Sequence, residues 1–260
     1  MATRLLYRTC LRQVAKLRQS GCKLFVLQSP VDPREWGRFR YPGEEEAGSA
    51  LLKGLLPESL LELLIGSPTV DELTSTTITP ETLAELVRVG FRAGIERVQK
   101  LESAGEAAEE RQALEDSGFE ALRHLMLQIT LFQCCSITDT QDIRVTVTAT
   151  AVKGSRGQRP GEQTYCYRVS VQNLSSREVQ LQGRYWRFVD AEDGVIEVPK
   201  FETGVVGQQP WLRPGQRFTY VSGCDLAASP GTMEGAFQMA FEGENNPFEA
   251  IIGQLDLRQP

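Results

Sequence analysis

The stretch Ile143-Arg144-Val145-Thr146-Val147-Thr148-Ala149 carries the pattern that decides the fold of half of this 260-residue chain. Aliphatic and polar residues alternate with a period of two, which is the pattern of a β-strand with one buried face. Further strand candidates follow at residues 165–171, 179–190, 218–221 and 233–241. Short strands separated by turn residues are typical of a sandwich. We therefore expect a β-sandwich in the C-terminal half of the chain.

Before residue 138 the apolar residues recur at helical spacing instead. We expect a first helix from about Thr3 to Gln19 and a second from Thr79, where an N-cap precedes Pro80. A third helix is expected over residues 106–133. Its inward-facing residues should be Leu114, Phe119, Leu122, Leu125, Met126 and Ile129. The sequence thus predicts an α+β protein of two domains, with a three-helix bundle over residues 1–133 and a long insertion at about 20–78.

The first helix has two distinct faces. One is apolar and consists of Leu6, Cys10, Val14 and Leu17. The other is a basic stripe with a spacing of four, formed by Arg4, Arg8, Arg12 and Lys16. The net charge of −6 hides this stripe, because no acidic residue occurs before Asp32. An acid-free, arginine-rich amphipathic segment is typical of mitochondrial or plastid targeting, and the same stripe would suit docking to an acidic partner helix.

Three segments of the N-terminal half resemble the LYR-motif (complex 1 LYR-like) family. They are Leu6-Tyr7-Arg8 with Arg12, Arg88-Val89-Gly90-Phe91-Arg92, and the stretch from Gly118 to Arg123. The resemblance implies a helical adaptor of the mitochondrial matrix that binds acyl carrier protein. The carrier would present acyl-phosphopantetheine, whose acyl chain enters the bundle, and no cofactor would be bound directly. The residues implied in carrier binding are Arg4, Leu6, Tyr7, Arg8, Arg12, Phe91 and Arg92.

Four segments of the C-terminal half resemble the ApaG domain. They cover residues 183–187, 204–210, 222–226 and 231–235. The resemblance implies an immunoglobulin- or fibronectin-III-like β-sandwich over residues 139–260 that serves as an interaction module, with a glycine loop linked to pyrophosphate binding. In this sequence the loop would use Gly204, Val205, Val206 and Gly207, but Glu202 replaces its first glycine. A carboxylate there opposes an anion, so a plain tight loop is the competing interpretation.

Several chemistries lack the residues that they need. A single histidine, His124, and six cysteines without a Cys-x-x-Cys pair predict no metal site. We expect no catalytic residues; an enzyme would have to rely on Cys224 or His124. No stretch approaches the roughly 20 apolar residues of a membrane span. The C-terminal half has more acids than bases, and one of Tyr185 and Trp186 should be core, so we expect no direct sequence-specific nucleic-acid binding.

These observations predict a non-enzymatic mitochondrial adaptor. It would bind acyl carrier protein through its helices and dock onto a large mitochondrial protein or ribonucleoprotein complex, such as a mitochondrial ribosome or respiratory complex, as a subunit or assembly factor. The alternative is a binding module for pyrophosphate or a phosphorylated small molecule. An aromatic cluster in the insertion, Trp36, Phe39 and Tyr41, indicates either partner contact or capping of the bundle.

Overall fold

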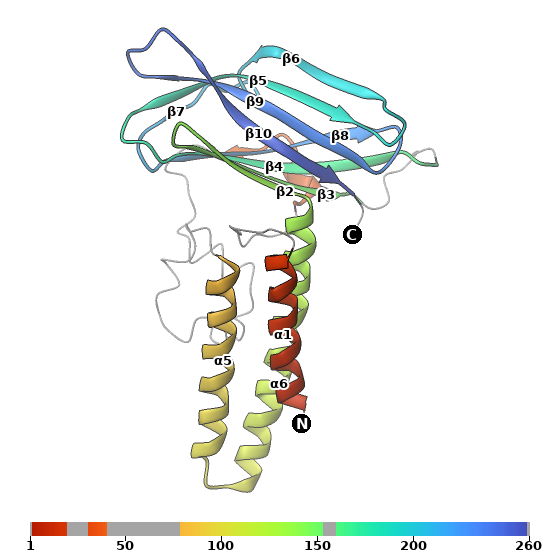
Figure 1. Cartoon of the computed structure of the whole chain (residues 1–260), viewed down its shortest axis with the longest axis vertical. Coiled ribbons are helices and arrows are strands. Elements are labelled where there is room, and N and C mark those ends of the chain that lie inside the picture. The colour runs from red at the N-terminus through yellow and green to blue at the C-terminus, as the bar shows by residue number, and fades with distance from the viewer. Residues whose placement is uncertain (1, 20–30, 41–78, 153–159, 259–260) are drawn as a thin grey trace. The chain divides into compact units, whose positions relative to one another are not determined.

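The computed structural model describes residues 2–19, 31–40, 79–152 and 160–258. The chain divides into two compact units. The first comprises Met1–Ser29 and Glu46–Thr130, and the second comprises Pro30–Glu45 and Leu131–Pro260. The described part of the first unit is helical and the second is a β-sandwich with a short N-terminal addition (Figure 1). Helices in the N-terminal half and a β-sandwich in the C-terminal half are therefore confirmed.

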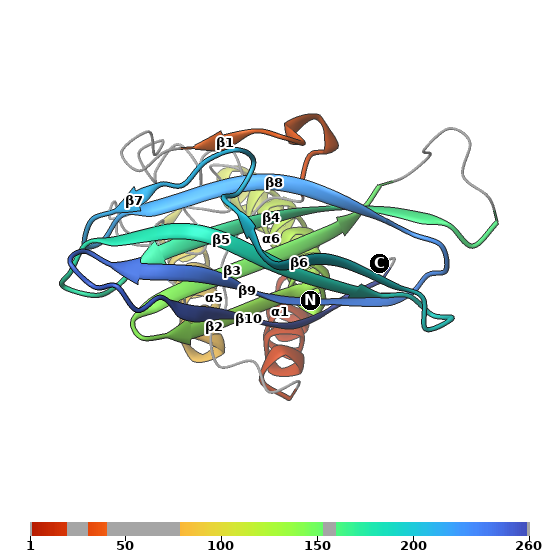
Figure 2. The same cartoon turned by 90° about the horizontal axis from the view of Figure 1, so that it is seen from above.

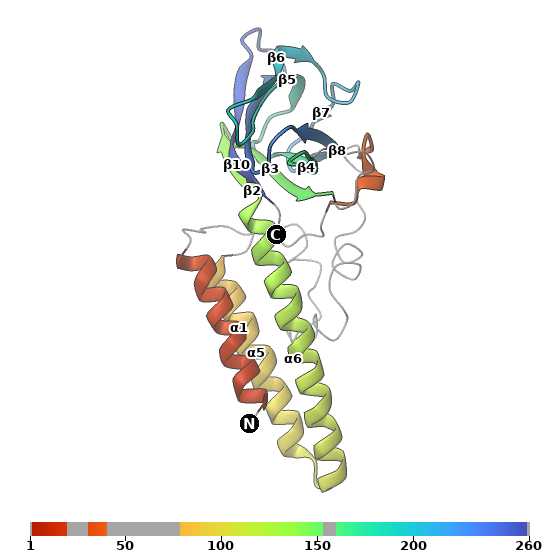
Figure 3. The same cartoon turned by 90° about the vertical axis from the view of Figure 1, so that its right-hand side faces the viewer.

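Three helices run alongside one another in the N-terminal half (Figure 3). They are α1 (Ala2–Gln19), α5 (Pro80–Lys100) and α6 (Ala104–Gln133). The predicted apolar face of α1 is confirmed, because Leu6, Cys10, Val14 and Leu17 are its buried residues. The N-terminus of α5 also begins where predicted, with the Leu83 N–H donating to the Thr79 carbonyl at 3.0 Å.

The helices meet closely around Gly118 of α6. A Cβ atom added at this position would lie 3.2 Å from Phe91 of α5 and 3.3 Å from Leu6 of α1. The side chain of Thr3 also donates to Glu115 at 2.7 Å, which joins α1 to α6. A glycine at the crossing permits this approach because it has no side chain.

Part of the predicted inward face of α6 is wrong. Leu114 and Leu125 are buried as expected, but Phe119 is 58% exposed and Met126 is 51% exposed. The small residues Gly118 and Ala121 occupy the buried positions between the two leucines. Close helix packing thus selects small side chains, whereas the sequence pattern favoured the large apolar neighbours that lie one position further round the helix.

The sandwich is built from two antiparallel sheets (Figure 1). The first has the order β1-β8-β4-β3-β2, with β1 (Phe39–Arg40), β8 (Arg217–Leu226), β4 (Gln163–Asn173), β3 (Ile143–Ala151) and β2 (Cys135–Thr140). The second has the order β10-β9-β5-β6, with β10 (Phe248–Leu257), β9 (Gly231–Phe241), β5 (Val179–Val189) and β6 (Val195–Thr203); β7 (Trp211–Leu212) pairs with β5. The Thr138 hydroxyl of β2 donates to the Ile251 carbonyl and the Thr140 hydroxyl accepts from the Ile251 N–H, which links the two sheets at one edge.

The core lies between the sheets and confirms the predicted alternation on β3. The four apolar residues of the predicted alternation, Ile143, Val145, Val147 and Ala149, are at most 3% exposed. Trp186 of β5 is buried at the centre, 5.6 Å from the Tyr167 ring and 6.0 Å from the Phe237 ring. Tyr185 lies on the opposite face of the same strand and is only partly buried. The aromatic pair therefore splits between core and surface, as a strand requires.

Residues 31–40, called the strap below, belong to the sandwich unit although they precede α5 in the sequence. The strap contains a short 3₁₀ helix, η1 (Pro33–Glu35), followed by β1, which lies beside β8 at the edge of its sheet (Figure 2). Trp36 and Phe39 thus contact the sandwich, and capping of the helices by these residues stays a prediction. Tyr41 lies outside the described residues.

Candidate functional site

The outer face of α1 carries a row of cations. Arg4, Arg8, Arg12 and Lys16 are all exposed and lie opposite the buried face of the helix. Within the described part of the chain, no carboxylate forms an ion pair with any of these four side chains. Arg18, at the end of the same helix, differs because it lies 3.1 Å from Glu81 of α5. The four-residue row is therefore a surface whose charge the described residues leave uncompensated.

The apolar members of the predicted carrier site lie behind this row. Leu6 is 4% exposed and Phe91 is 2% exposed, so both belong to the helix core. Tyr7 is half-buried, and its ring centroid is 5.5 Å from that of Phe91 at an angle of 59°. Arg92 follows Phe91 on α5 and is exposed. The structure thus brings Leu6, Tyr7 and Phe91 together, and it places the arginines on the surface.

The glycine loop after β6 forms a tight turn with positive φ angles at Gly204 (66°), Val206 (45°) and Gly207 (76°). Two of its N–H groups are already used internally: Gly204 donates to Gln182 and Val205 donates to Gln208, each at 2.8 Å. The Gly204 carbonyl accepts from the Arg184 guanidinium at 2.6 Å. For the N–H groups of Val206 and Gly207, no acceptor is found in the described part of the chain. These two adjacent donors are what the loop could offer to an anion.

Cys224 is a poor candidate for a nucleophile. Burial raises the pKa of its thiol to about 12, and the neighbouring Asp225 carboxylate acts in the same direction. The thiol is then protonated at neutral pH, whereas the thiolate is the reactive form. The other enzymatic candidate was His124, whose side chain lies outside the described part of the structure.

The five cysteines in the described part of the chain are free thiols. Cys10, Cys134, Cys135, Cys166 and Cys224 are free, while Cys22 lies outside the described residues. Over the described ranges, no three His, Cys, Asp or Glu side chains gather in a way that could hold a metal ion. A search of the same ranges also finds no helix long and apolar enough to cross a membrane.

One contact surface was not located by sequence reasoning. The strap lies along the β8 edge, and its Glu35 pairs with Arg168 of β4 at 3.1 Å. The aromatic residues of the insertion were the only sequence signal for it. That signal marks a contact but does not say which unit the residues touch.

Comparison with known proteins shows which family the C-terminal half resembles. The ApaG domain profile matches residues 153–241. ApaG of Methylobacterium sp. (strain 4-46) is 39% identical over 122 residues, which are 47% of this chain and 92% of the relative. ApaG of Thiobacillus denitrificans is 43% identical over 96 residues, which are 37% of this chain and 73% of the relative. The crystal structure of a putative ApaA protein from Bordetella pertussis is 36% identical; the match covers 47% of this chain and 98% of that one, with a TM-score of 0.42.

These relatives correct one expectation. The matched proteins are bacterial ApaG proteins, which are not mitochondrial, so the predicted location in the mitochondrial matrix is wrong. The prediction rested on the resemblance of the helical half to the LYR family and on the acid-free basic pattern of α1. A docking helix for an acidic partner shows the same basic pattern. The likeness of residues 1–133 to the LYR family stays a prediction. By sequence identity over nearly the full length of its relatives, the chain belongs to the ApaG family through its C-terminal domain.

Proposed function

We propose that this protein is a non-enzymatic adaptor. Its helical unit would bind acyl carrier protein, and its ApaG domain would dock onto a larger protein or ribonucleoprotein assembly. The observation that carries the first half is the row of Arg4, Arg8, Arg12 and Lys16 on the outer face of α1. Four exposed cations without an ion-pair partner among the described residues are suited to steering and orienting an acidic helix.

Arginine is the appropriate cation for such a surface. Its guanidinium can contact a carboxylate or a phosphate through two parallel hydrogen bonds, and lysine cannot. Three of the four cations in the row are arginines, and Arg92 on α5 adds a further exposed one. Leu5, which is 61% exposed, lies three residues before Arg8 and offers an apolar contact beside the charges. The surface therefore combines charge with a small apolar area, as helix–helix docking requires.

The apolar residues behind the row would receive the acyl chain. Leu6, Tyr7 and Phe91 converge in the helix core, close to Gly118. Each methylene group that leaves water contributes about 0.8 kcal/mol, so the chain would add strongly to affinity. In this proposal the arginines recognise the carrier surface, while the core residues recognise the acyl chain.

A titration of the full-length protein with acyl-loaded carrier protein tests this proposal. Reversing two charges in the row, Arg8→Glu with Arg12→Glu, should weaken binding by roughly 100-fold, because both contacts become repulsive. The matched control is Lys100→Glu with Arg111→Glu, which changes the net charge equally at exposed positions of α5 and α6. The control should bind within about threefold of the wild type. Equal affinities of the double variant and the wild type would refute the proposal.

Anion binding by the ApaG glycine loop is the second candidate. Its support is the pair of adjacent N–H groups at Val206 and Gly207, which find no acceptor in the described part of the chain. Calorimetry of the full chain with pyrophosphate tests it, since a site of this kind should give measurable heat at millimolar ligand. The Gly207→Val variant, which strains the positive φ of 76°, should abolish that heat. An absence of heat with the wild type would eliminate this candidate.

A further inference from the structure

The strap adds a strand to the exposed edge of the first ApaG sheet. Phe39 pairs with Tyr220 and Arg40 with Thr219 of β8. The Gly37 N–H donates to the Val221 carbonyl at 2.9 Å, and the Val221 N–H donates to the Arg38 carbonyl at 3.0 Å. These backbone bonds do not depend on side-chain identity. They are the bonds by which an extended peptide adds to a sheet edge.

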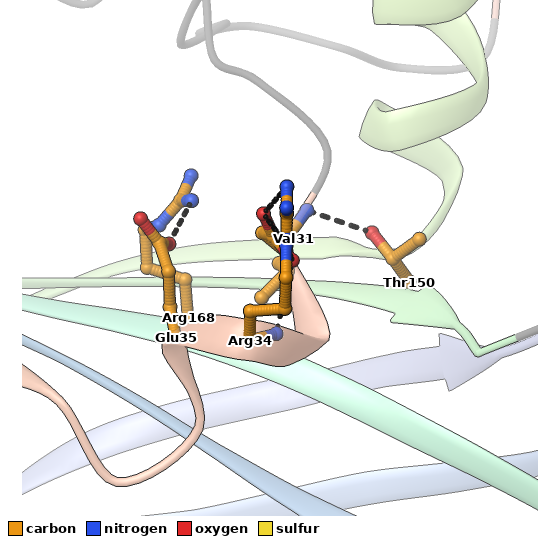
Figure 4. Close-up of polar contacts among 6 residues, drawn as sticks. Val31, Arg34, Glu35, Thr150 and Arg168 are labelled. Carbon is orange, nitrogen blue, oxygen red and sulfur yellow. Dashed lines mark hydrogen bonds and ion pairs between the residues drawn. The ribbon is translucent and has the colours of Figure 1, made fainter.

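Two anchors at the start of the strap supply specificity (Figure 4). Val31 is 2% exposed and packs against Cys166 and Val221, while its N–H donates to the Thr150 hydroxyl at 3.2 Å. Four residues later, Glu35 accepts from the Arg168 guanidinium at 3.1 Å. The Glu35 and Arg168 side chains are only 28% and 21% exposed. The strap is thus recognised by an apolar pocket and by a partly buried cation at a fixed separation.

Trp36 provides the third anchor by lying over Gly223 of β8. A Cβ atom added at Gly223 would fall 2.4 Å from the indole ring, so only glycine leaves room for the ring at this place. The indole nevertheless remains 47% exposed. A strand glycine that makes room for a half-exposed aromatic ring marks a contact between segments rather than a core position.

The strap pairs with the edge strand β8 over only a short length. β4 pairs with the other side of β8 along almost the whole strand, from Leu226 to Arg217, whereas β1 pairs with only Thr219 and Tyr220. The other described contacts of the strap include the two backbone bonds to Val221, the three anchors and the packing of Phe39 near Phe218, with ring centroids 6.3 Å apart. A short segment that uses a few anchors can be exchanged for another segment of the same chemistry.

We propose that the β8 edge of the ApaG domain is a peptide-binding site, and that the strap occupies this site in cis. The partner would be an extended peptide with an aliphatic residue four positions before a Glu-Trp-Gly sequence. The aliphatic side chain takes the place of Val31, the glutamate meets Arg168, and the indole covers Gly223. Access is regulated by competition, because a tethered strap acts at a high effective concentration and a partner must displace it.

This inference names a surface for the docking half of the proposed function and rests on it. It does not involve α1, so carrier-protein binding is measured separately in the same samples. A chain that binds peptide but no carrier contradicts the carrier half alone, and a chain that binds carrier but no peptide contradicts the inference alone.

The experiment uses the full-length protein and fluorescent peptides of residues 31–40, read by anisotropy. Trp36→Ala weakens the cis strap at a half-exposed position, so the folded variant should bind the native peptide about tenfold more tightly than the wild type does. Arg168→Glu reverses the charge that faces Glu35. That variant should bind a peptide carrying Glu35→Arg about tenfold more tightly than the native peptide.

Circular dichroism melting establishes that each variant is folded before the titrations. If Arg168→Glu does not fold, Trp36→Ala alone decides the question. Two results would overturn the inference: a folded Trp36→Ala chain that binds the native peptide no better than the wild type, or a folded Arg168→Glu chain that shows no preference for the peptide with the reversed charge.

Discussion

The cations on α1 and those on the second sheet of the sandwich differ in whether they have ion-pair partners. On the sheet, Arg187 pairs with Glu234 at 3.2 Å and Lys200 pairs with Glu249 at 2.8 Å. On α1, Arg8 and Arg12 have no such partner in the described part of the chain. Both sets are at the surface, so burial does not explain the difference. The sandwich compensates these charges with acids on other strands of the same sheet, whereas α1 presents charges that the described residues do not pair.

The two surfaces differ in whether their charges are balanced within the described part of the chain. Exposed ion pairs contribute little stability, typically 0.2–1 kcal/mol each, so pairing is not what holds the sandwich together. An unpaired row with one sign, however, attracts an oppositely charged surface over about a Debye length. The comparison therefore supports the proposal that α1, rather than the outer face of the second sheet, is a recognition surface.

The largest expected effect comes from the core of the sandwich. Trp186→Ala should lower the free energy of unfolding of the ApaG domain by about 3–5 kcal/mol, because it removes the central, 1%-exposed indole from a closely packed core. Chemical denaturation followed by far-ultraviolet circular dichroism measures this change. Trp211→Ala is the control, since that side chain is 45% exposed and its loss should cost much less. Equal losses from the two variants would contradict the packing described here.

An intermediate effect is expected at alkaline pH. Burial raises the pKa of Cys224 to about 12 from an ordinary value of 9.0. The unfolded chain then loses this proton at a lower pH than the folded chain does. The resulting stabilisation is complete below pH 9 and is lost as the pH rises towards 12. Denaturation measured across this range should show a shallower decline for Cys224→Ala than for the wild type; parallel declines would contradict the burial of this thiol.

The smallest effects test the comparison of charges itself. Arg187→Ala should lower the free energy of unfolding by roughly 0.2–1 kcal/mol, because it breaks exposed ion pairs with Glu197 and Glu234. Arg8→Ala should leave it unchanged or slightly raised, since it breaks no described pair and reduces repulsion along the row. Thermal melts of the two variants under one buffer condition measure both. A clear loss for Arg8→Ala would show that this arginine has an intramolecular partner.

Much of the sandwich could be predicted from local pattern. The alternation on β3 and the apolar spacing on α1 each reflect one buried face. The period of the apolar residues is therefore enough to locate both elements in the sequence. β6 was missed because its residues are mostly exposed and carry no alternation. β10 was missed because a bulge between Ile252 and Leu255 interrupts its period.

The candidate sites were predicted only in part, again because a sequence pattern describes one helix or strand at a time. Basic spacing on α1 identifies an exposed face, because a helix fixes which residues share a side. The strap could not be placed, since its strand has only two residues and exists through pairing with β8, far along the sequence. Phe119 and Met126 were assigned to the core by size, although the crossing at Gly118 decides which face of α6 is buried. The sequence pattern therefore could not predict the contacts between segments that lie far apart in the chain.

Native mass spectrometry of the protein purified from its own cells tests the central claim most directly, with the wild type and the Arg8→Glu, Arg12→Glu variant prepared in parallel. The account predicts that the wild type retains a carrier protein bearing acyl-phosphopantetheine and that the folded variant does not. A carrier protein retained equally by both, or absent from both, would contradict the assignment of the α1 face as a docking surface.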